Sequence, residues 1–140
     1  MKRKIDMNKH FYGKYLLLKT NGELCEIDNT NGELFDCTDE KFNDFVHKAI
    51  NRDCYECVYP VPFRKYNIVM LVDESGLLKR KPVNPLAWNI YSGIDLDALI
   101  VGDVLFCGEC YEDFGEGFPE HHFCALNHVQ MNILKLALSI

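Results

Sequence analysis

Two Asn-Gly dipeptides constrain the fold of this chain most strongly. The first, Asn21-Gly22, lies between two short extended runs, YLLLKT at residues 15–20 and ELCEID at residues 23–28. An Asn-Gly pair in this setting is a strong local signal of a β-hairpin, because both residues accept the positive φ angles of a tight turn. Asn31-Gly32 turns the chain a second time before ELFDC. The sequence therefore predicts antiparallel strands near its N-terminus.

The rest of the chain alternates between strand and helix patterns. We expect a helix at 38–50, an extended segment at 54–63, a strand, tight turn and second strand at 67–80, a short helix from 84, a buried strand at 98–108, a glycine-rich acidic loop at 108–124 and a final helix from 128.

Local signals mark several of these boundaries. Thr38 is a favourable N-cap for the first helix, and Asn127 with Gln130 forms a capping box for the last. Pro60 and Pro62 confine their segment to a sheet edge or a loop. Together the patterns predict a single α+β domain over residues 1–140. Its sheet is expected to be mixed and mainly antiparallel, with about three helices packed on it in a single layer.

Composition and cysteine content favour a cytoplasmic protein. Apolar residues make up 48% of the 140 and charged residues 26%, which is typical of ordered globular domains. No run approaches the roughly 18 apolar residues of a membrane span, and the basic start lacks the apolar core of a signal peptide. The seven cysteines, an odd number, fit thiols kept reduced. We therefore expect a cytoplasmic location and no membrane partner.

The negative charge is concentrated in one stretch. The net charge is −6, and the acids between residues 109 and 120 account for five of those charges. A nucleic-acid partner requires a basic face, so the charge argues against one. The stretch is either a solvated loop or a surface that binds a basic protein, with Glu112, Asp113 and Glu116 as its central acids.

Two Cys-x-x-Cys pairs raise the question of zinc. Cys54 and Cys57 lie in an extended segment, where positions three apart point to opposite faces. Cys107 and Cys110 surround a glycine that permits a tight turn. The residues that would complete a tetrahedral zinc site at this second pair are His121, His122 and Cys124. We predict no resident metal or cofactor and keep a zinc-stabilised structural module as an alternative.

Recognisable catalytic motifs are missing from the sequence. It has no nucleophile elbow, no Gly-x-Ser-x-Gly and no phosphate-binding loop. A calcium loop would need alternating Asp or Asn ligands, which ECYEDFGEGFPE does not provide. The sequence therefore predicts a binding protein and not an enzyme.

The segment KPVNPLAWNIYSG contains the single tryptophan of the chain. Asn84 suits an N-cap and Pro85 the first helical position, so Asn84, Trp88 and Tyr91 would share one helix face. An amide beside two aromatic rings is suited to stacking on a base and hydrogen-bonding its edge. The nearby cations that we predict to hold phosphate are Arg64, Lys65, Arg80 and Lys81. The alternative is that Asn84 only caps the helix while both rings pack against the sheet.

The last helix has two apolar stripes. One consists of Val129, Ile133, Leu136, Ala137 and Ile140, and the other of Met131, Leu134 and Leu138. Two stripes indicate burial on two sides, since one core face needs only one. A homodimer formed through this helix would explain the second stripe, and so would a strand or loop laid across it.

Residues 66–108 resemble an uncharacterised family of small bacteriophage and mobile-element proteins, known only as a domain of unknown function. The pattern is carried by Asp73, Glu74, Gly76, Leu77, Leu78, Pro82, Asn84, Ala87, Val101 and Gly102, and extends less specifically to Leu126-Asn127. This chain departs from the pattern at Trp88, where a small residue is expected, and in its longer Cys-rich acidic loop.

The resemblance implies a setting and no specific activity. Accessory proteins of phages commonly blunt host defences, by sequestering a nucleotide-derived immune signal or by blocking a host protein. The expectation is therefore a non-enzymatic counter-defence protein that sequesters a small nucleotide-type ligand. The alternatives are a protein-binding inhibitor that uses the acidic loop and the zinc-stabilised module.

Overall fold

The predicted hairpin is confirmed. In the computed structural model, which describes residues 13–28, 39–50, 55–73, 80–92, 99–112 and 120–139, β1 (Lys14–Leu18) pairs antiparallel with β2 (Leu24–Asp28). Gly22 adopts φ +88° in the turn between them, and its N–H donates to the Lys19 carbonyl at 2.9 Å. Glycine accepts this conformation without steric cost. The turn therefore forms where the Asn-Gly pair predicts it.

Six strands form one sheet, whose strand pairs are all antiparallel across the described residues. The other four are β3 (Tyr55–Val58), β4 (Ile68–Asp73), β5 (Val104–Glu112) and β6 (Glu120–Cys124). The strand order is β2-β1-β5-β4-β3, and β6 pairs with the C-terminal half of β5. The α+β class with a mainly antiparallel sheet is thus confirmed.

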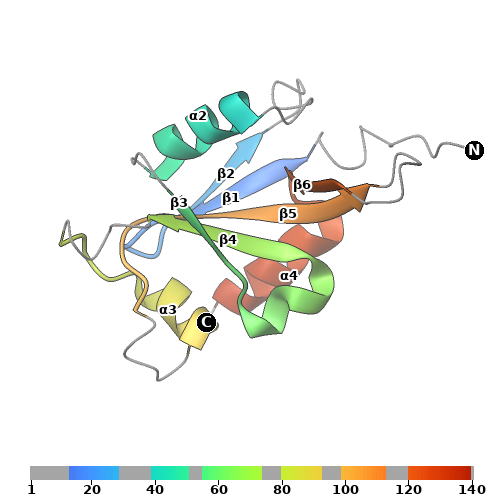
Figure 1. The fold of residues 1–140 in the computed structure, drawn as a ribbon. Coiled ribbons are helices and arrows are strands. Elements are labelled where there is room, and N and C mark those ends of the chain that lie inside the picture. The colour runs from blue at the N-terminus through green and yellow to red at the C-terminus, as the bar shows by residue number, and fades with distance from the viewer. Residues whose placement is uncertain are drawn as a thin grey trace, which may run out of the picture.

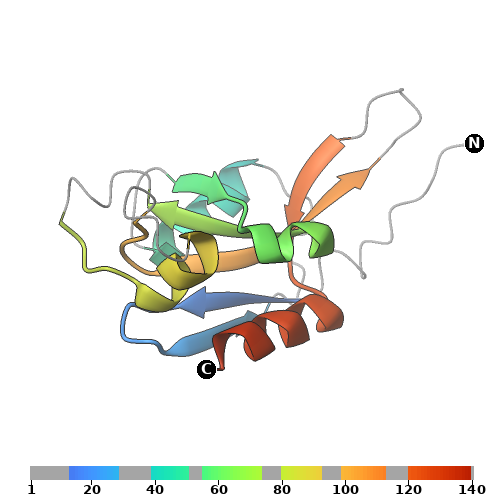
Figure 2. The same cartoon turned by 90° about the horizontal axis from the view of Figure 1, so that it is seen from below.

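Helices cover both faces of this sheet, so the prediction of a single helical layer is wrong. One face carries α2 (Asp39–Ile50), and the other carries α3 (Pro85–Ser92) and α4 (His128–Leu138), as Figure 1 and Figure 2 show. The physical reason lies in β4, where all six residues are buried. A strand that is apolar on both sides requires cover on both sides.

Two hydrophobic cores result, one on each side of the sheet. The core under α3 and α4 includes Leu16, Leu18, Met70, Phe106 and Leu134. The core under α2 includes Tyr15, Phe42, Val46, Leu71 and Leu105. Neighbouring residues of β1, β4 and β5 alternate between the two cores, as the two-residue period of a strand dictates.

Two sequence predictions of irregular structure need correction. Residues 61–63, predicted as the end of an extended segment at a sheet edge or in a loop, begin a 3₁₀ helix, η1 (Val61–Tyr66), with proline in its first turn. Residues 108–124, predicted as a loop, continue β5 as far as Glu112 and return in β6 from Glu120. Residues 113–119 lie outside the described part of the chain.

The C-terminal helix begins as predicted. The Gln130 N–H donates to Asn127 Oδ1 at 2.8 Å, and the Asn127 N–H donates to Gln130 Oε1 at 2.9 Å. These two bonds complete the capping box. One predicted apolar stripe is buried in the core at Met131, Leu134 and Leu138. The other leaves Val129 63% and Leu136 75% exposed, and the predicted homodimer through this stripe stays a prediction.

Candidate ligand-binding site

Asn84 is fully buried, and its amide is used within the protein. Its Nδ2 donates to the Leu18 carbonyl at 3.1 Å and to the Gly102 carbonyl at 3.0 Å. Its Oδ1 accepts from the Ala87 N–H at 3.3 Å, as expected of a helix N-cap. Asn84 therefore joins β1, the approach to β5 and α3. The geometry corresponds to the capping alternative and leaves no face of this amide turned toward a ligand.

Trp88 and Tyr91 are half-buried and pack against the core below the sheet. Both belong to the apolar surroundings of that core, together with Leu86 and Ile90. The helix on which they lie therefore serves mainly as a cover for the sheet. The structure thus places the two rings beside this core.

Lys81 forms a largely buried ion pair. Its Nζ lies 2.7 Å from Asp73 Oδ2 and 3.4 Å from the Ile50 carbonyl oxygen, so it joins the end of β4 to the end of α2. The Asp73 side chain is 0% exposed and that of Lys81 is 20% exposed. Arg80 beside it is exposed and adopts φ +56°. Lys81, one of the cations predicted to hold phosphate, is thus already paired with groups of the protein itself.

Arg64 and Lys65 lie at the other end of β4. They belong to η1, which leads into β4 at Ile68, whereas Lys81 contacts Asp73, where β4 ends. A strand of six residues spans about 17 Å at roughly 3.4 Å per residue. The seven residues predicted to share a ligand therefore divide between two ends of the sheet and do not form one site.

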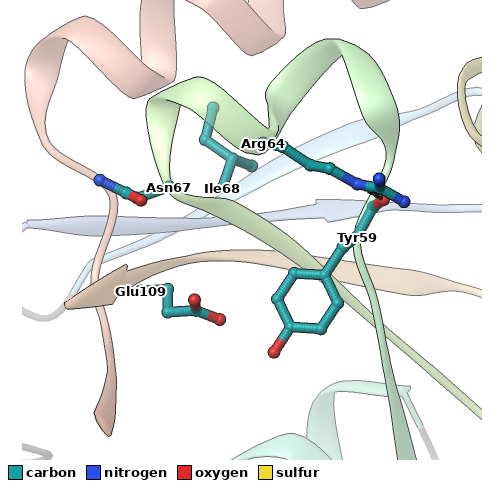
Figure 3. A pocket seen from close by; sticks show the side chains of 5 residues that line it. All are labelled: Tyr59, Arg64, Asn67, Ile68 and Glu109. Atoms are coloured by element: carbon teal, nitrogen blue, oxygen red, sulfur yellow. Dashed lines mark hydrogen bonds between the residues drawn. The ribbon is translucent and has the colours of Figure 1, made fainter. Parts of the chain in front are cut away.

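The structure instead places a pocket beside η1. Its volume is about 390 Å³, and it is lined by Tyr59, Arg64, Asn67, Ile68 and Glu109. These residues come from the end of β3, from η1 and the turn after it, and from β4 and β5. Figure 3 shows the Tyr59 ring and the Glu109 carboxylate facing the same space, with the Arg64 guanidinium beyond Tyr59 in that view. Of the predicted site residues, only Arg64 lines it.

Hydrogen bonds to backbone carbonyls hold the pocket walls in place. Arg64 Nε donates to the Tyr59 carbonyl at 2.9 Å, which ties the arginine to the segment before η1. Asn67 adopts the left-handed conformation with φ 58°, and its carbonyl accepts from the Glu109 N–H at 2.9 Å. Gln130 Nε2 donates to the same carbonyl at 3.2 Å. The pocket is therefore attached to β5 and α4 and is formed before any ligand arrives.

The half-buried thiol of Cys57 lies close to the carboxylate. Burial, together with the negative charges of Glu109 and Glu56, raises the pKa of Cys57 to about 11. A thiol with this pKa stays protonated near neutral pH and is a poor nucleophile. The pocket thus presents an aromatic ring, a guanidinium and a carboxylate, groups that bind a polar ring compound without forming a covalent bond.

The zinc alternative is only partly covered by the described residues. Cys107 packs in the core under α2. The Cys124 sulfur lies 3.1 Å from where a Cβ at Gly108 would be, and successive residues of a strand face opposite sides. Cys107 and Cys124 therefore lie on opposite faces of the sheet. The side chains of Cys110, His121 and His122 are outside the described part, and the described residues contain no group of three metal ligands.

The remaining expectations are placed as follows. Glu109 begins the acidic stretch and lines the pocket. Glu112 ends β5, and the described residues do not include Asp113 and Glu116. Within the described ranges no helix is long and apolar enough to cross a membrane.

Sequence reasoning missed Tyr59, Asn67 and Glu109. Glu109 appeared to be one of several acids in a loop, but β5 extends beyond it and fixes its position. Asn67 follows two cations and a tyrosine, a signal of a left-handed helix end that the sequence does contain. The pairing of β3, β4 and β5 that brings the three together is long-range and has no local signal.

Comparison with known proteins returns one family. Neither the curated proteins nor the solved structures include a match to this chain. The domain of unknown function DUF3846 matches residues 39–131, which is more than half of the chain. That span contains α2, β3, η1, β4, α3, β5 and β6, and with them Asn84 and all five residues that line the pocket. The chain therefore belongs to the DUF3846 family.

Proposed function

We propose that this protein binds a small nucleotide-type ligand in the pocket beside η1 and holds it without changing it chemically. One observation carries the proposal: a ring, a cation and a carboxylate line a single cavity of about 390 Å³. This volume is in the usual range of small-molecule sites, about 300–1,000 Å³. The hydrogen bonds at Arg64 and Asn67 support a preformed site, which lowers the ordering cost of binding.

Each of three side chains has a distinct role in this proposal. The Tyr59 ring, 38% exposed, stacks on a base. Arg64 is exposed, and only its Nε is bound to the Tyr59 carbonyl, so its terminal nitrogens pair with phosphate. Glu109 accepts hydrogen bonds from the base. The separation of guanidinium and carboxylate by the ring suits a ligand that is anionic at one end and a hydrogen-bond donor at the other.

The biological role that we propose is sequestration. The resemblance to phage and mobile-element proteins supports an accessory protein that lowers the free concentration of a nucleotide signal in a host cell. Such a protein acts by tight binding in stoichiometric amounts, and no reaction is required. This mechanism is consistent with a pocket that offers no activated nucleophile among its described residues, since the adjacent Cys57 thiol has a pKa of about 11.

The test compares two arginines by isothermal titration calorimetry. The wild-type protein is titrated with mononucleotides, cyclic nucleotides and ADP-ribose, and the best binder is then titrated into Arg64→Ala and Arg80→Ala. Both variants remove one exposed positive charge, but only Arg64 lines the pocket. Loss of a charge-assisted hydrogen bond weakens binding by roughly tenfold or more.

We expect Arg64→Ala to show this loss and Arg80→Ala to bind as the wild type does. Binding that is lost in Arg80→Ala and kept in Arg64→Ala would move the site to the other end of the sheet. Absence of binding for every nucleotide in the panel would refute the proposed function.

A further inference from the structure

We propose that Gln130, which lies outside the five described residues that line the pocket, is the residue that positions the pocket wall for ligand binding. The inference rests on the proposed function, because it assigns a further residue to the same site. Gln130 is a positioning residue in this assignment: it acts through other residues and does not touch the ligand.

The Gln130 amide is held in one place at the start of α4. Gln130 is 7% exposed, and its Oε1 accepts from the Asn127 N–H at 2.9 Å. Its Nε2 donates to the Tyr66 carbonyl at 2.8 Å and to the Asn67 carbonyl at 3.2 Å. A glutamine amide nitrogen carries two donor hydrogens, which are enough for both carbonyls. One side chain thus connects the start of α4 with the turn between η1 and β4.

The turn that Gln130 holds is part of the pocket wall. Asn67 lines the pocket and adopts φ 58°, a conformation that costs energy for a residue with a side chain and persists where its surroundings hold it. The Asn67 N–H donates to the Arg64 carbonyl at 3.3 Å, and the Asn67 carbonyl accepts from the Glu109 N–H at 2.9 Å. The position of Arg64, the proposed phosphate ligand, therefore depends on a turn that Gln130 helps to hold.

Strand β5 leaves room for this amide. A Cβ at Gly108 would lie 3.1 Å from Gln130 Oε1 and 3.1 Å from the Cys124 sulfur. A side chain at this position would therefore crowd the amide, whereas glycine permits the close approach. In the view of Figure 3 the ribbon of α4 begins near Asn67, in agreement with the hydrogen bond between Gln130 and the Asn67 carbonyl.

The order of the wall determines the affinity of the pocket. A ligand that requires one arrangement of the wall binds with an affinity reduced by the fraction of molecules that have this arrangement. One hydrogen bond changes such an equilibrium by about fivefold, and the Gln130 amide supplies two to the turn. Without them the turn and Arg64 leave the binding arrangement in part of the molecules. Gln130 thus strengthens binding without contact with the ligand.

The experiment compares Gln130→Met with Asn127→Ala by isothermal titration calorimetry of the full-length protein. The probe is the mononucleotide, the cyclic nucleotide or ADP-ribose, whichever binds the wild type best. Each variant removes one of the two bonds of the capping box, but only Gln130→Met removes the bonds to the pocket wall. We expect the dissociation constant to rise by about fivefold or more in Gln130→Met and to stay within about twofold in Asn127→Ala.

A second comparison separates positioning from a loss of stability. Gln130→Met is also combined with Arg64→Ala. If Gln130 acts by positioning the turn next to Arg64, the added substitution should weaken binding by no more than about twofold, because the group that it positions is already removed. A substitution that only lowers the folded fraction would weaken binding by the same factor with and without Arg64.

The outcomes separate this inference from the function on which it rests. Gln130→Met that binds within about twofold of the wild type overturns the positioning role and leaves the proposed function standing. An equal loss in Asn127→Ala, or the same loss with and without Arg64, overturns it as well. If Gln130→Met does not fold, as judged by circular dichroism, Gln130→Ala replaces it, because it removes the same amide without adding an apolar group of that size. No binding of any probe to the wild type refutes the proposed function, and the role of Gln130 falls with it.

Discussion

Replacing Asn84 tests whether this residue belongs to the fold or to a ligand site. In Asn84→Ala the two hydrogen bonds from Nδ2 to the carbonyls of Leu18 and Gly102 are lost, as is the bond that caps α3 at Ala87. Each buried side-chain bond contributes about 1 kcal/mol net, and the cap contributes about 1 kcal/mol more. We therefore expect the free energy of unfolding to fall by about 3 kcal/mol, a large fraction of the roughly 5–15 kcal/mol of a typical domain.

The assay is urea unfolding followed by tryptophan fluorescence. Trp88 is the only tryptophan of the chain and packs against the core on the same helix, so its emission reports the loss of this packing. Asn89→Ala is the control, because Asn89 is an exposed asparagine one position after Trp88. An exposed substitution of this kind changes the free energy of unfolding by no more than about 0.5 kcal/mol.

A second substitution at the same position sharpens the test. Asn84→Asp keeps an acceptor for the Ala87 N–H, but it turns a carboxylate oxygen toward two carbonyl oxygens in place of the Nδ2 donor. Buried acceptors that face one another without a proton repel, so we expect Asn84→Asp to be at least as unstable as Asn84→Ala. A loss below about 1 kcal/mol in Asn84→Ala, accompanied by lost nucleotide binding, would refute this reasoning and restore Asn84 as a ligand residue.

Three further predictions concern other parts of the fold. Lys81→Met removes the cation that is paired with the buried Asp73 carboxylate. It should lower the free energy of unfolding, measured in urea, by about 3 kcal/mol. Adding Asp73→Leu to the Lys81→Met variant should restore part of this loss. A hydrogen bond from Lys135 and the charge of Lys135 hold the pKa of Glu26 below its ordinary value of 4.5. The stability that results from this lowered pKa is present above pH 4.5 and is lost as the pH falls through the pKa of the folded state. In Glu26→Gln the free energy of unfolding should therefore fall less steeply with decreasing pH in the acid range. An unchanged pH dependence in that range would contradict this prediction. The exposed Leu136 predicts a dimer by size-exclusion chromatography with light scattering that Leu136→Glu converts to a monomer, and a monomeric wild type would exclude this interface.

Four residues of the motif quoted in the sequence analysis have structural roles. Asp73 receives the ion pair from Lys81, Asn84 joins three segments, and Ala87 is fully buried where α3 meets the sheet. Gly102 adopts φ +78°, and a Cβ there would lie 3.0 Å from the Lys81 side chain. These four residues of the motif therefore serve the packing of the fold.

Local rules explain what could be predicted. The hairpin turn at Gly22, the N-cap at Asn84 and the capping box of Asn127 with Gln130 depend on residues within a few positions of one another. For the same reason the periodicity of residues 39–50 was sufficient to predict α2. The single helical layer failed because amphipathic periodicity shows that a helix has a buried face and does not show which side of a sheet that face will cover.

The sequence by itself therefore determined the hairpin of β1 and β2, the helices α2, α3 and α4 and the α+β class, since short-range hydrogen bonds and side-chain periodicity depend on neighbouring residues. It did not determine η1, β6 or the length of β5. Only the tertiary structure decided the site. Pairing of β3 with β4 and of β4 with β5 brings Tyr59 and Glu109, fifty positions apart in the chain, to the walls of one pocket. In the same fold Asn84 and Lys81 form buried contacts with other parts of the protein. They do so because polar groups that a protein encloses require hydrogen-bond or charge partners inside it.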